Sequence, residues 1–458
     1  MIFDEMEFNV YDKAERKARK AFELYEDGRM TQALEALETA LEINPSNSSW
    51  HFNKALTLDA ISQFEDAIKE YELALQLSPD DLEILNSLAV DYTRTGQYDL
   101  AIDTFEHIQE LDRRFEPCYC NRIITYTEMG LHDLAEQMFY LAQQINPDCA
   151  LCYYNIGNSL FARGQYKKAI RCWLRTAELE PSHPQINYRI AQAYWSDGDS
   201  ERSREHFLAE LRVNPGDIDV ILDFGLFLLG AGDIESAKEK FNRILELKPG
   251  YAPALFYLGE IAFNNGDYER AIELFNQTMQ KDSTFPGPRY RLAQYALTRG
   301  EVTDARDYLI SELKLAGEDA NILVSMGSMF LTIDDLDYAM NCLLRAVDID
   351  SANADAYYYL GVASAVKGSF ADAAEFFTHA LDIKSEHVLA LRDSAFVYLA
   401  MGKLDEAAKR IEKAHSLADD DPQLRALKRR IHLARIKEQI AVFFCRLKPR
   451  FIFKESRR

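Results

Sequence analysis

Four cysteines in the second quarter of the chain are the residues whose type and spacing come nearest to a metal site. They are Cys118, Cys120, Cys149 and Cys152. Zn²⁺ prefers four tetrahedral ligands and binds thiolates well, so these thiols could hold a zinc ion if the fold brought them together. The spacing of Cys118 and Cys120 is poor for a zinc knuckle, and cysteine is also a common small core residue. We therefore predict no bound metal or cofactor, and keep the four thiols as candidate ligands.

Motifs for other kinds of chemistry do not occur in the sequence. It has no phosphate-binding GxxxxGK, no GxGxxG after a strand, no HExxH and no GxSxG. No strand pattern is present on which most of these motifs would lie. Histidines and acidic residues are scattered over what look like helix surfaces. We expect that the protein is not an enzyme.

A period of 34 residues organises the chain. Eleven alanines and one serine keep this spacing without insertion or deletion: Ala33, Ala67, Ala101, Ala135, Ala169, Ser203, Ala237, Ala271, Ala305, Ala339, Ala373 and Ala407. A fixed period of this length is typical of stacked repeats, in which each repeat contacts only its neighbours.

Other positions keep the same period. A small residue such as Gly157 usually precedes the alanine by twelve residues, a glycine such as Gly96 precedes it by five, and a bulky residue such as Trp173 follows it by four. Small residues let two helices approach closely, and glycine accepts the left-handed backbone of a turn. The bulky residue is expected to fill the space between neighbouring repeats. Glu312 stands where a small residue usually packs, so residues 282–320 are predicted to form the least regular joint.

This pattern closely resembles the tetratricopeptide repeat family, most clearly from Tyr153 to Pro181 and from Leu255 to Asp282. The resemblance covers residues 14–421 as twelve tandem repeats. Residues 1–13 are then an amino-terminal extension or cap, and residues 422–458 a carboxy-terminal capping helix and basic tail. The resemblance implies an all-α fold, a right-handed superhelical solenoid of antiparallel helix pairs, whose first helices line a concave groove.

The resemblance also indicates which side chains face that groove. They recur four and three residues apart on each first helix, which places them on one helical stripe. The candidate groove residues are Tyr154, Asn158, Phe161, Tyr188, Gln192, Trp195, Leu222, Leu226, Leu229, Phe256, Glu260, Phe263, Tyr290, Gln294 and Leu297. Aromatic area broken by amides suits an extended peptide or an amphipathic helix. The alternative is that several of these rings pack only against neighbouring repeats.

Charge separates the tail from the repeats. Residues 422–458 hold twelve Lys/Arg and two Glu, a net of +10, and because the whole chain carries −22, residues 1–421 carry −32. An acidic body repels nucleic acid, so no nucleic-acid partner is expected. The basic segment is interpreted first as a capping helix with a solvated face. The alternatives are a membrane-surface anchor through residues 439–458 and a tail that occupies the groove until a partner displaces it.

We predict a protein–protein interaction scaffold that captures a partner peptide or helix in its groove without catalysis. The rival hypothesis is a metal-binding enzyme subunit that uses the cysteine corner. The acidic start of the sequence, MIFDEMEFNV, does not resemble a secretory signal, and the seven cysteines do not look like a disulfide framework. We therefore expect a cytoplasmic protein. The sequence leaves its oligomeric state open.

Overall fold

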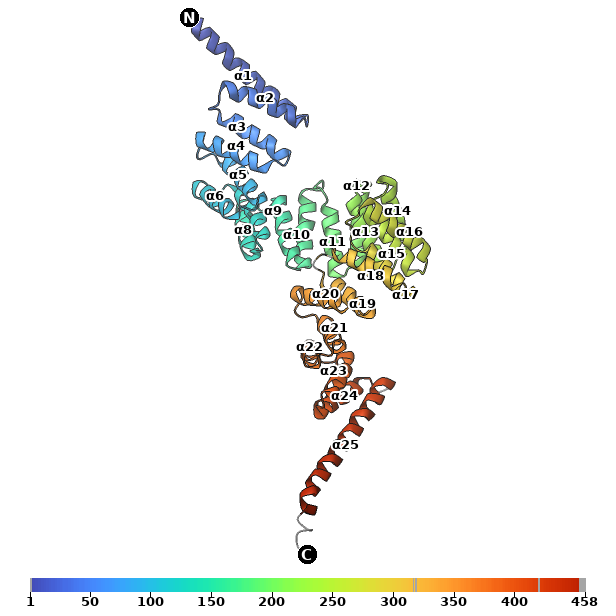
Figure 1. The fold of residues 1–458 in the computed structure, drawn as a ribbon. Coiled ribbons are helices and arrows are strands. Elements are labelled where there is room, and N and C mark those ends of the chain that lie inside the picture. Colours follow the sequence, from blue (N-terminus) through green and yellow to red (C-terminus); the bar gives the residue numbers. More distant parts are fainter. Residues whose placement is uncertain (1, 316, 318, 419–420, 453–458) are drawn as a thin grey trace. The chain divides into compact units, whose positions relative to one another are not determined.

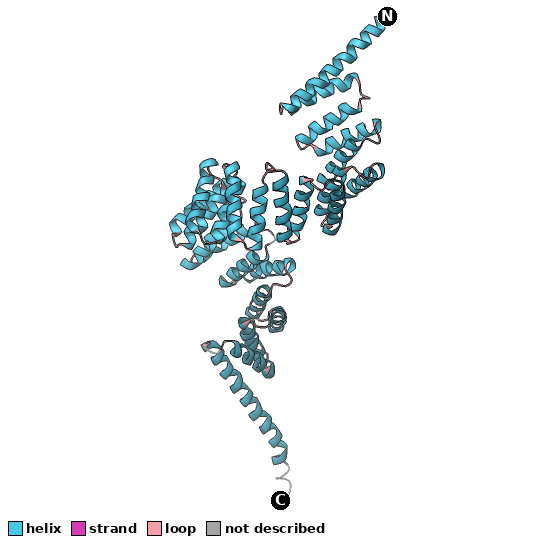
Figure 2. Ribbon diagram, turned by 180° about the vertical axis from the view of Figure 1, so that it is seen from behind, coloured by secondary structure: helices cyan, strands magenta, loops and turns pink. Residues whose placement is uncertain are grey.

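The computed structural model describes residues 2–315, 317, 319–418 and 421–452, with side chains for residues 13–439 apart from the same gaps. Every regular element in this described part is an α-helix (Figures 1 and 2). The sequence-based prediction of an all-α repeat fold is therefore confirmed. None of the described helices is both long enough and apolar enough to cross a bilayer.

The helices are joined mostly by turns of a few residues. The earlier helices are α1 (Ile2–Glu26), α2 (Met30–Ile43), α3 (Ser48–Ala60), α4 (Phe64–Leu77), α5 (Leu82–Arg94), α6 (Tyr98–Leu111), α7 (Glu116–Glu128), α8 (His132–Ile145), α9 (Ala150–Ala162), α10 (Tyr166–Leu179), α11 (Ile186–Asp197), α12 (Ser200–Val213) and α13 (Ile218–Gly230). The later helices are α14 (Ile234–Leu247), α15 (Ala252–Asn264), α16 (Tyr268–Lys281), α17 (Pro288–Arg299), α18 (Val302–Leu313), α19 (Ala320–Thr332), α20 (Leu336–Ile349), α21 (Ala354–Val366), α22 (Phe370–Ile383), α23 (Val388–Ala400), α24 (Leu404–Leu417) and α25 (Pro422–Ile452).

The chain forms two compact units, Met1–Ala237 and Lys238–Arg458, and the boundary falls inside α14. In each unit consecutive helices pack as antiparallel pairs, such as α9 with α10 and α21 with α22, and each pair packs on the next. The unbroken 34-residue period gave no sign of this division, because the repeat pattern continues through the boundary.

The turn inside each pair needs a left-handed backbone, as the periodic glycine predicts. Gly96 has φ +73° and nothing lies near the place where a Cβ would be, so conformation rather than space selects glycine there. Two repeats lack this glycine, and the residues at the equivalent position, Ser62 and Asp334, still adopt φ of 62° and 61°. The turn geometry is therefore kept even where the favoured residue is missing.

The small and bulky positions meet within one pair. A Cβ on Gly157 of α9 would lie 2.4 Å from Nε1 of Trp173 on α10, so the indole occupies the space that a side chain would need. The bulky residue also reaches the next repeat, as expected. Phe207 of α12 stacks on Phe224 of α13 with ring centroids 5.2 Å apart. Bulky residues at this position thus fill space within a pair, as Trp173 does, and between repeats, as Phe207 does.

Two helices, each the first of its pair, begin late. Each starts two residues after the position that the 34-residue period predicts from the start of the preceding first helix in the same unit. These are α11 and α17, with 12 residues each. A proline and a residue with positive φ precede both, Pro184 with Gln185 (φ 55°) and Pro286 with Gly287 (φ 106°). The joint at α17 lies in the segment predicted to be least regular, whereas the joint at α11 was not anticipated.

A buried glutamate from the second helix of the same pair caps each late helix. Glu210 accepts a hydrogen bond from the Tyr188 amide at 3.3 Å, and Glu312 accepts one from the Gly287 amide at 2.5 Å. Burial raises the pKa of both carboxyls, while the amides that donate to them act in the opposite direction. The glutamates accept hydrogen bonds from amides at the amino-terminal end of each helix, which have no partner within the helix.

The ends of the repeat array differ. The amino-terminal extension is continuous with the first helix, because α1 runs from Ile2 through residues 13 and 14 without a break. At the other end, Leu424, Leu427 and Ile431 of α25 are buried in a cluster with residues of α24. The first part of the basic segment therefore covers the last helix pair, as a capping helix would.

Candidate functional site

The predicted groove residues of α9 are half-buried. Tyr154, Asn158 and Phe161 follow one stripe of the helix, four and three residues apart. The ring of Tyr154 lies against that of His183, with centroids 4.4 Å apart, and the ring of Phe161 packs on Trp173, with centroids 5.6 Å apart. Part of each aromatic surface thus supports neighbouring elements, and part stays accessible.

On α11 the polar stripe residues bond to the next repeat. The Tyr188 hydroxyl donates to Oδ2 of Asp223 on α13 at 2.7 Å, and the Gln192 amide donates to the same oxygen at 2.9 Å. Burial and Asp223 raise the pKa of Tyr188. Trp195 remains 37% exposed and meets the ring of Phe227 edge-on. Leu222, Leu226 and Leu229 continue the half-buried stripe on α13.

In the second unit the corresponding stripe is organised around an ion pair. Arg291 of α17 donates from Nε to Oε1 of Glu260 at 2.7 Å and from Nη2 to Oε2 at 2.5 Å. Its Nη1 also donates to Gln294, and its guanidinium lies over the rings of Phe263 and Tyr290. Arg291 was missed as a candidate site residue, although the acidic Glu260 one repeat earlier is a signal that could have revealed its central position.

Phe256 packs against other aromatic side chains of the second unit. Its ring packs on Phe275 and Phe285, and it fills the space beside Gly287. Leu297 is half-buried on α17. The alternative interpretation of the stripe, packing between elements, therefore describes Phe256 well.

One inter-repeat bond recurs along both units. A polar group on one first helix bonds to a residue 35 positions later on the next first helix, as in Asn86–Asn121 at 3.0 Å and Tyr358–Asp393 at 3.0 Å. The pair Tyr188–Asp223 has the same spacing, whereas Glu260 and Arg291 bond across 31 residues. Several predicted groove residues thus also hold successive repeats in register, and whether they bind a ligand stays a prediction.

The cysteine corner is assembled differently from the prediction. Ligand atoms of Glu116, Cys120, Cys149 and Cys152 all lie within 4.8 Å of one another. Cys118 lies apart from them: it is buried beside α6 and its Sγ donates to the Phe105 carbonyl at 3.3 Å. The helical spacing of four residues places Glu116 on the same face of α7 as Cys120, and carries Cys118 to another face.

The thiols of the corner are electrostatically linked. Hydrogen bonds from the Cys120 and Cys152 thiols lower the pKa of Cys149, whereas interactions with Cys120 and Cys149, together with burial, raise the pKa of Cys152. Burial raises the pKa of Glu116, and the neighbouring Cys149 raises it further. Cys118 has no such partner, and burial raises its pKa to about 12.

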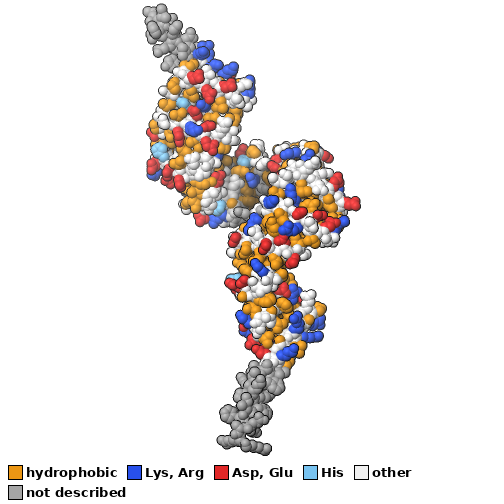
Figure 3. Space-filling model, in the orientation of Figure 1, with side chains coloured by type: hydrophobic (Ala, Val, Ile, Leu, Met, Phe, Trp, Pro, Cys, Tyr) orange, Lys and Arg blue, Asp and Glu red, His pale blue; other side chains and the backbone are white. Residues whose placement is uncertain are grey.

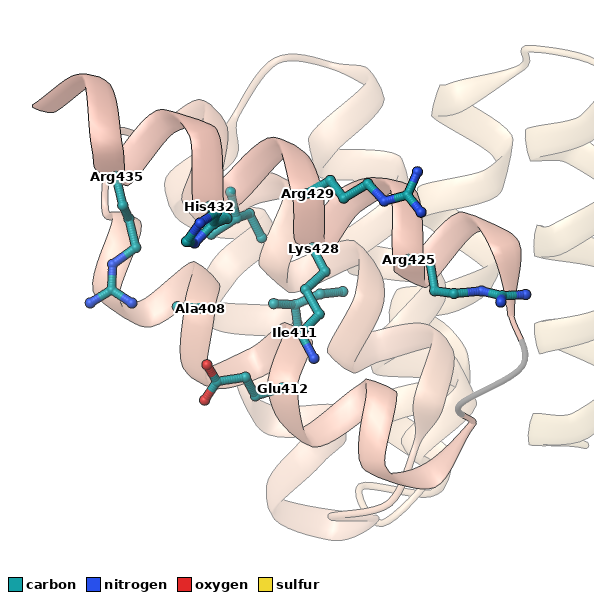
Figure 4. A pocket seen from close by; sticks show the side chains of 9 residues that line it. Ala408, Ile411, Glu412, Arg425, Lys428, Arg429, His432 and Arg435 are labelled. Atoms are coloured by element: carbon teal, nitrogen blue, oxygen red, sulfur yellow. The ribbon is translucent and has the colours of Figure 1, made fainter.

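A basic pocket of about 360 Å³ lies between α24 and α25 (Figure 4). Ala408, Ile411 and Glu412 line it from α24, and six residues line it from α25: Arg425, Lys428, Arg429, Ile431, His432 and Arg435. Arg435 bonds to Asp405 of α24 at 2.7 Å. Over the face visible in Figure 3, acidic and basic side chains are interspersed among apolar ones.

A family model described as tetratricopeptide repeat matches residues 19–82, 154–218, 222–284 and 330–387, which is more than half of the chain, and a second one matches residues 367–431. The chain belongs to the tetratricopeptide repeat family. No curated protein sequence matches it.

Solved structures similar to this tetratricopeptide repeat protein share little sequence with it. The APC/C Cut9–Hcn1 hetero-tetramer is 14% identical over 92% of this chain and 96% of that chain, with a TM-score of 0.43. Yeast Tom70 is 14% identical over 93% of this chain and 96% of that chain, with a TM-score of 0.39. A tetratricopeptide repeat protein from Parabacteroides merdae is 17% identical over 58% of this chain and 99% of that chain, with a TM-score of 0.44. The family assignment rests on the repeats themselves, and these scores add no functional argument. The family supports a protein–protein interaction scaffold.

Proposed function

We propose that this tetratricopeptide repeat protein is an interaction scaffold whose binding face, formed by α9, α11 and α13, holds an extended segment of a protein partner. The observation that carries the proposal is the continuity of half-buried side chains on three consecutive first helices. Trp195 is at its most exposed point, with 37% of its surface accessible.

The chemistry of this face suits an apolar segment with a free backbone. Tyr154 and Trp195 offer aromatic area, and aromatic anchors of this kind often contribute about 2 kcal/mol or more to binding. The Leu222, Leu226 and Leu229 stripe extends the apolar contact along α13. Asn158 is half-buried between aromatic residues and can bond to a peptide backbone.

The negative charge of the repeats favours basic partner segments over acidic ones. Residues 1–421 carry −32, which attracts basic segments over distances comparable to the screening length of about 8 Å at physiological salt. We therefore expect partner segments that combine apolar residues with lysine or arginine.

Selection of a random peptide library on the full chain tests the proposal without knowledge of the natural partner. Peptides enriched on the wild type should bind Trp195→Ala at least about tenfold more weakly, a loss of roughly 1.4 kcal/mol. Tyr140→Ala is the matched control, because Tyr140 is a 59% exposed aromatic residue on the second helix α8 of the same unit. Equal weakening in both variants, or in neither, would reject the assignment of the face.

A second candidate function is association with a membrane surface. Leu433 and Ile436 of α25 are 57% and 38% exposed beside Arg435 and Lys437, as in a basic amphipathic helix. Most of the anchor predicted at residues 439–458 lies outside the residues whose side chains are described. Sedimentation with anionic vesicles should fall when residues 439–458 are deleted, and equal sedimentation of both proteins would exclude the anchor.

A further inference from the structure

Three thiols and one carboxylate meet where two first helices of the first unit begin. Glu116 occupies the first turn of α7 and Cys120 follows one turn later, while Cys149 caps α9 and Cys152 lies in its first turn. The Cys152 thiol is 3.1 Å from Oε1 of Glu116, and the Cys152 amide donates to the Cys149 sulfur at 3.3 Å. All four ligand atoms lie within 4.8 Å of one another.

These distances are close to those of a filled site. In a tetrahedral zinc site with Zn–S bonds of about 2.3 Å, neighbouring ligand atoms lie about 3.8 Å apart. The separations of the four atoms therefore need to change by no more than about 1 Å, some shortening and the Cys152–Glu116 separation lengthening, which side-chain rotations can supply. Three sulfurs and one carboxylate oxygen belong to the donor set that Zn²⁺ accepts.

The surroundings favour an anionic ligand set. Three thiolates and a carboxylate around Zn²⁺ leave an excess of about two negative charges, and the amino-terminal ends of α7 and α9 both carry partial positive charge at this point. The Asn155 amide donates to the carbonyl and to the sulfur of Cys120, at 3.2 and 3.5 Å. Such outer hydrogen bonds orient metal ligands.

Two other described cysteines, Cys118 and Cys342, show what a packing thiol looks like in this protein. Cys118 bonds only to a backbone carbonyl, and Cys342 lies in an apolar cluster around Phe330. Neither has a second thiol or a carboxylate among its contacts there. The grouping of Glu116 with three thiols is therefore a separate arrangement, which core packing does not require.

We propose that Glu116, Cys120, Cys149 and Cys152 bind one Zn²⁺ ion that joins α7 to α9. With four protein ligands the coordination sphere is closed, which is the mark of a structural site; a catalytic zinc keeps a position open for water. The ion clamps two consecutive repeats beside the proposed binding face, since α9 also carries Tyr154. The site is independent of the proposed function, and its closed coordination sphere differs from the open one of a metal-dependent enzyme.

Metal analysis of the purified full chain tests the site. The untagged protein, prepared with a thiol reductant and no added chelator, is expected to contain about one zinc per chain by plasma mass spectrometry. Cys152→Ser should lose this zinc, and Glu116→Gln should bind it at least about tenfold more weakly. Cys118→Ser, two residues from Cys120, is the matched control and should keep a full equivalent.

A spectroscopic titration keeps the test valid if Cys152→Ser does not fold. Co²⁺ added to the metal-free wild type should give the intense visible absorption of tetrahedral thiolate coordination, saturate at one equivalent, and be displaced by Zn²⁺. The weak absorption of octahedral Co²⁺ would overturn the proposal. Equal zinc content in Cys118→Ser and Cys152→Ser would also overturn it, as would a disulfide among the three thiols in freshly purified protein.

Discussion

At the residue level, burial raises the pKa of several carboxyl groups in this solenoid. Asp91 of α5 is 1% exposed and bonds to Arg94 at 3.0 Å. Burial and the nearby Asp59 raise its pKa to about 7, although Arg94 acts in the opposite direction. Its second oxygen, Oδ2, has no hydrogen-bond partner. Asp91 is therefore protonated in the folded protein under mildly acidic conditions and charged above them.

This shift makes stability depend on pH. Because the folded-state pKa of Asp91 lies above its unfolded value near 3.8, the folded state holds the proton more tightly, and stability falls as pH rises from about 4 to about 7. Asp91→Asn removes this dependence. We expect the loss of unfolding free energy between pH 5.5 and pH 8 to be smaller in the variant by up to about 2 kcal/mol. Urea unfolding at both values measures the difference; the same pH dependence in both proteins would refute the assignment.

Glycine at the close approach of two helices gives a second prediction. Gly157→Ala places a methyl group against the Trp173 indole, and overpacking of this kind costs about 1–3 kcal/mol, more than the helix propensity that alanine adds. Gly230→Ala is the control, because no atom beyond its chain neighbours and its own helix backbone lies within 4 Å of the place that its methyl group would take in α13. Thermal unfolding should show a lower melting temperature for Gly157→Ala only; two equal shifts would contradict the packing argument.

Among the helices, the late starts of α11 and α17 show how a side chain from the second helix of the pair caps the first. Glu312→Ala removes the acceptor of the Gly287 amide and is expected to destabilise the α17 region by about 1–3 kcal/mol. Hydrogen exchange of peptides from residues 286–300 should accelerate. Glu312→Gln keeps one acceptor oxygen and should lie between the wild type and Glu312→Ala, and unchanged exchange in both would show that the cap is unimportant.

The elements were largely predictable from the sequence because the periodic residues act locally. A left-handed turn needs glycine, and a close helix approach needs a small residue facing a large one, as at Gly157 and Trp173. The joint at α11 was missed because Gln185 is not a residue that usually signals positive φ. Its signature is non-local: Pro184 and Glu210 occur together, as do Pro286 and Glu312.

The candidate sites were less predictable for the same reason. Tyr188 and Gln192 bond to Asp223 one repeat later, so half of each interaction belongs to another helix. Glu116 was not recognised beside the cysteines because its place depends on the face of α7 that it shares with Cys120. Side chains that meet across repeats are found by comparing residues about one period apart, and single positions do not reveal them.

In the molecule as a whole, a tetratricopeptide repeat scaffold carries one proposed metal site and one proposed binding face. Removing metal with a chelator should loosen the first helices that the clamp joins, so hydrogen exchange should rise in α7 and α9. The same treatment should leave α21 and α23, which lie in the other unit, unchanged. A uniform change across both units would contradict a local structural site.

A partner segment is proposed to lie along α9, α11 and α13. Hydrogen exchange of the full chain, with and without a peptide selected on it, measures which helices that segment covers. We predict protection of peptides that cover residues 150–162, 186–197 and 218–230, and little change elsewhere in the first unit. Protection confined to α24 and α25, or to the second helices such as α8 and α10, would show that the segment binds elsewhere.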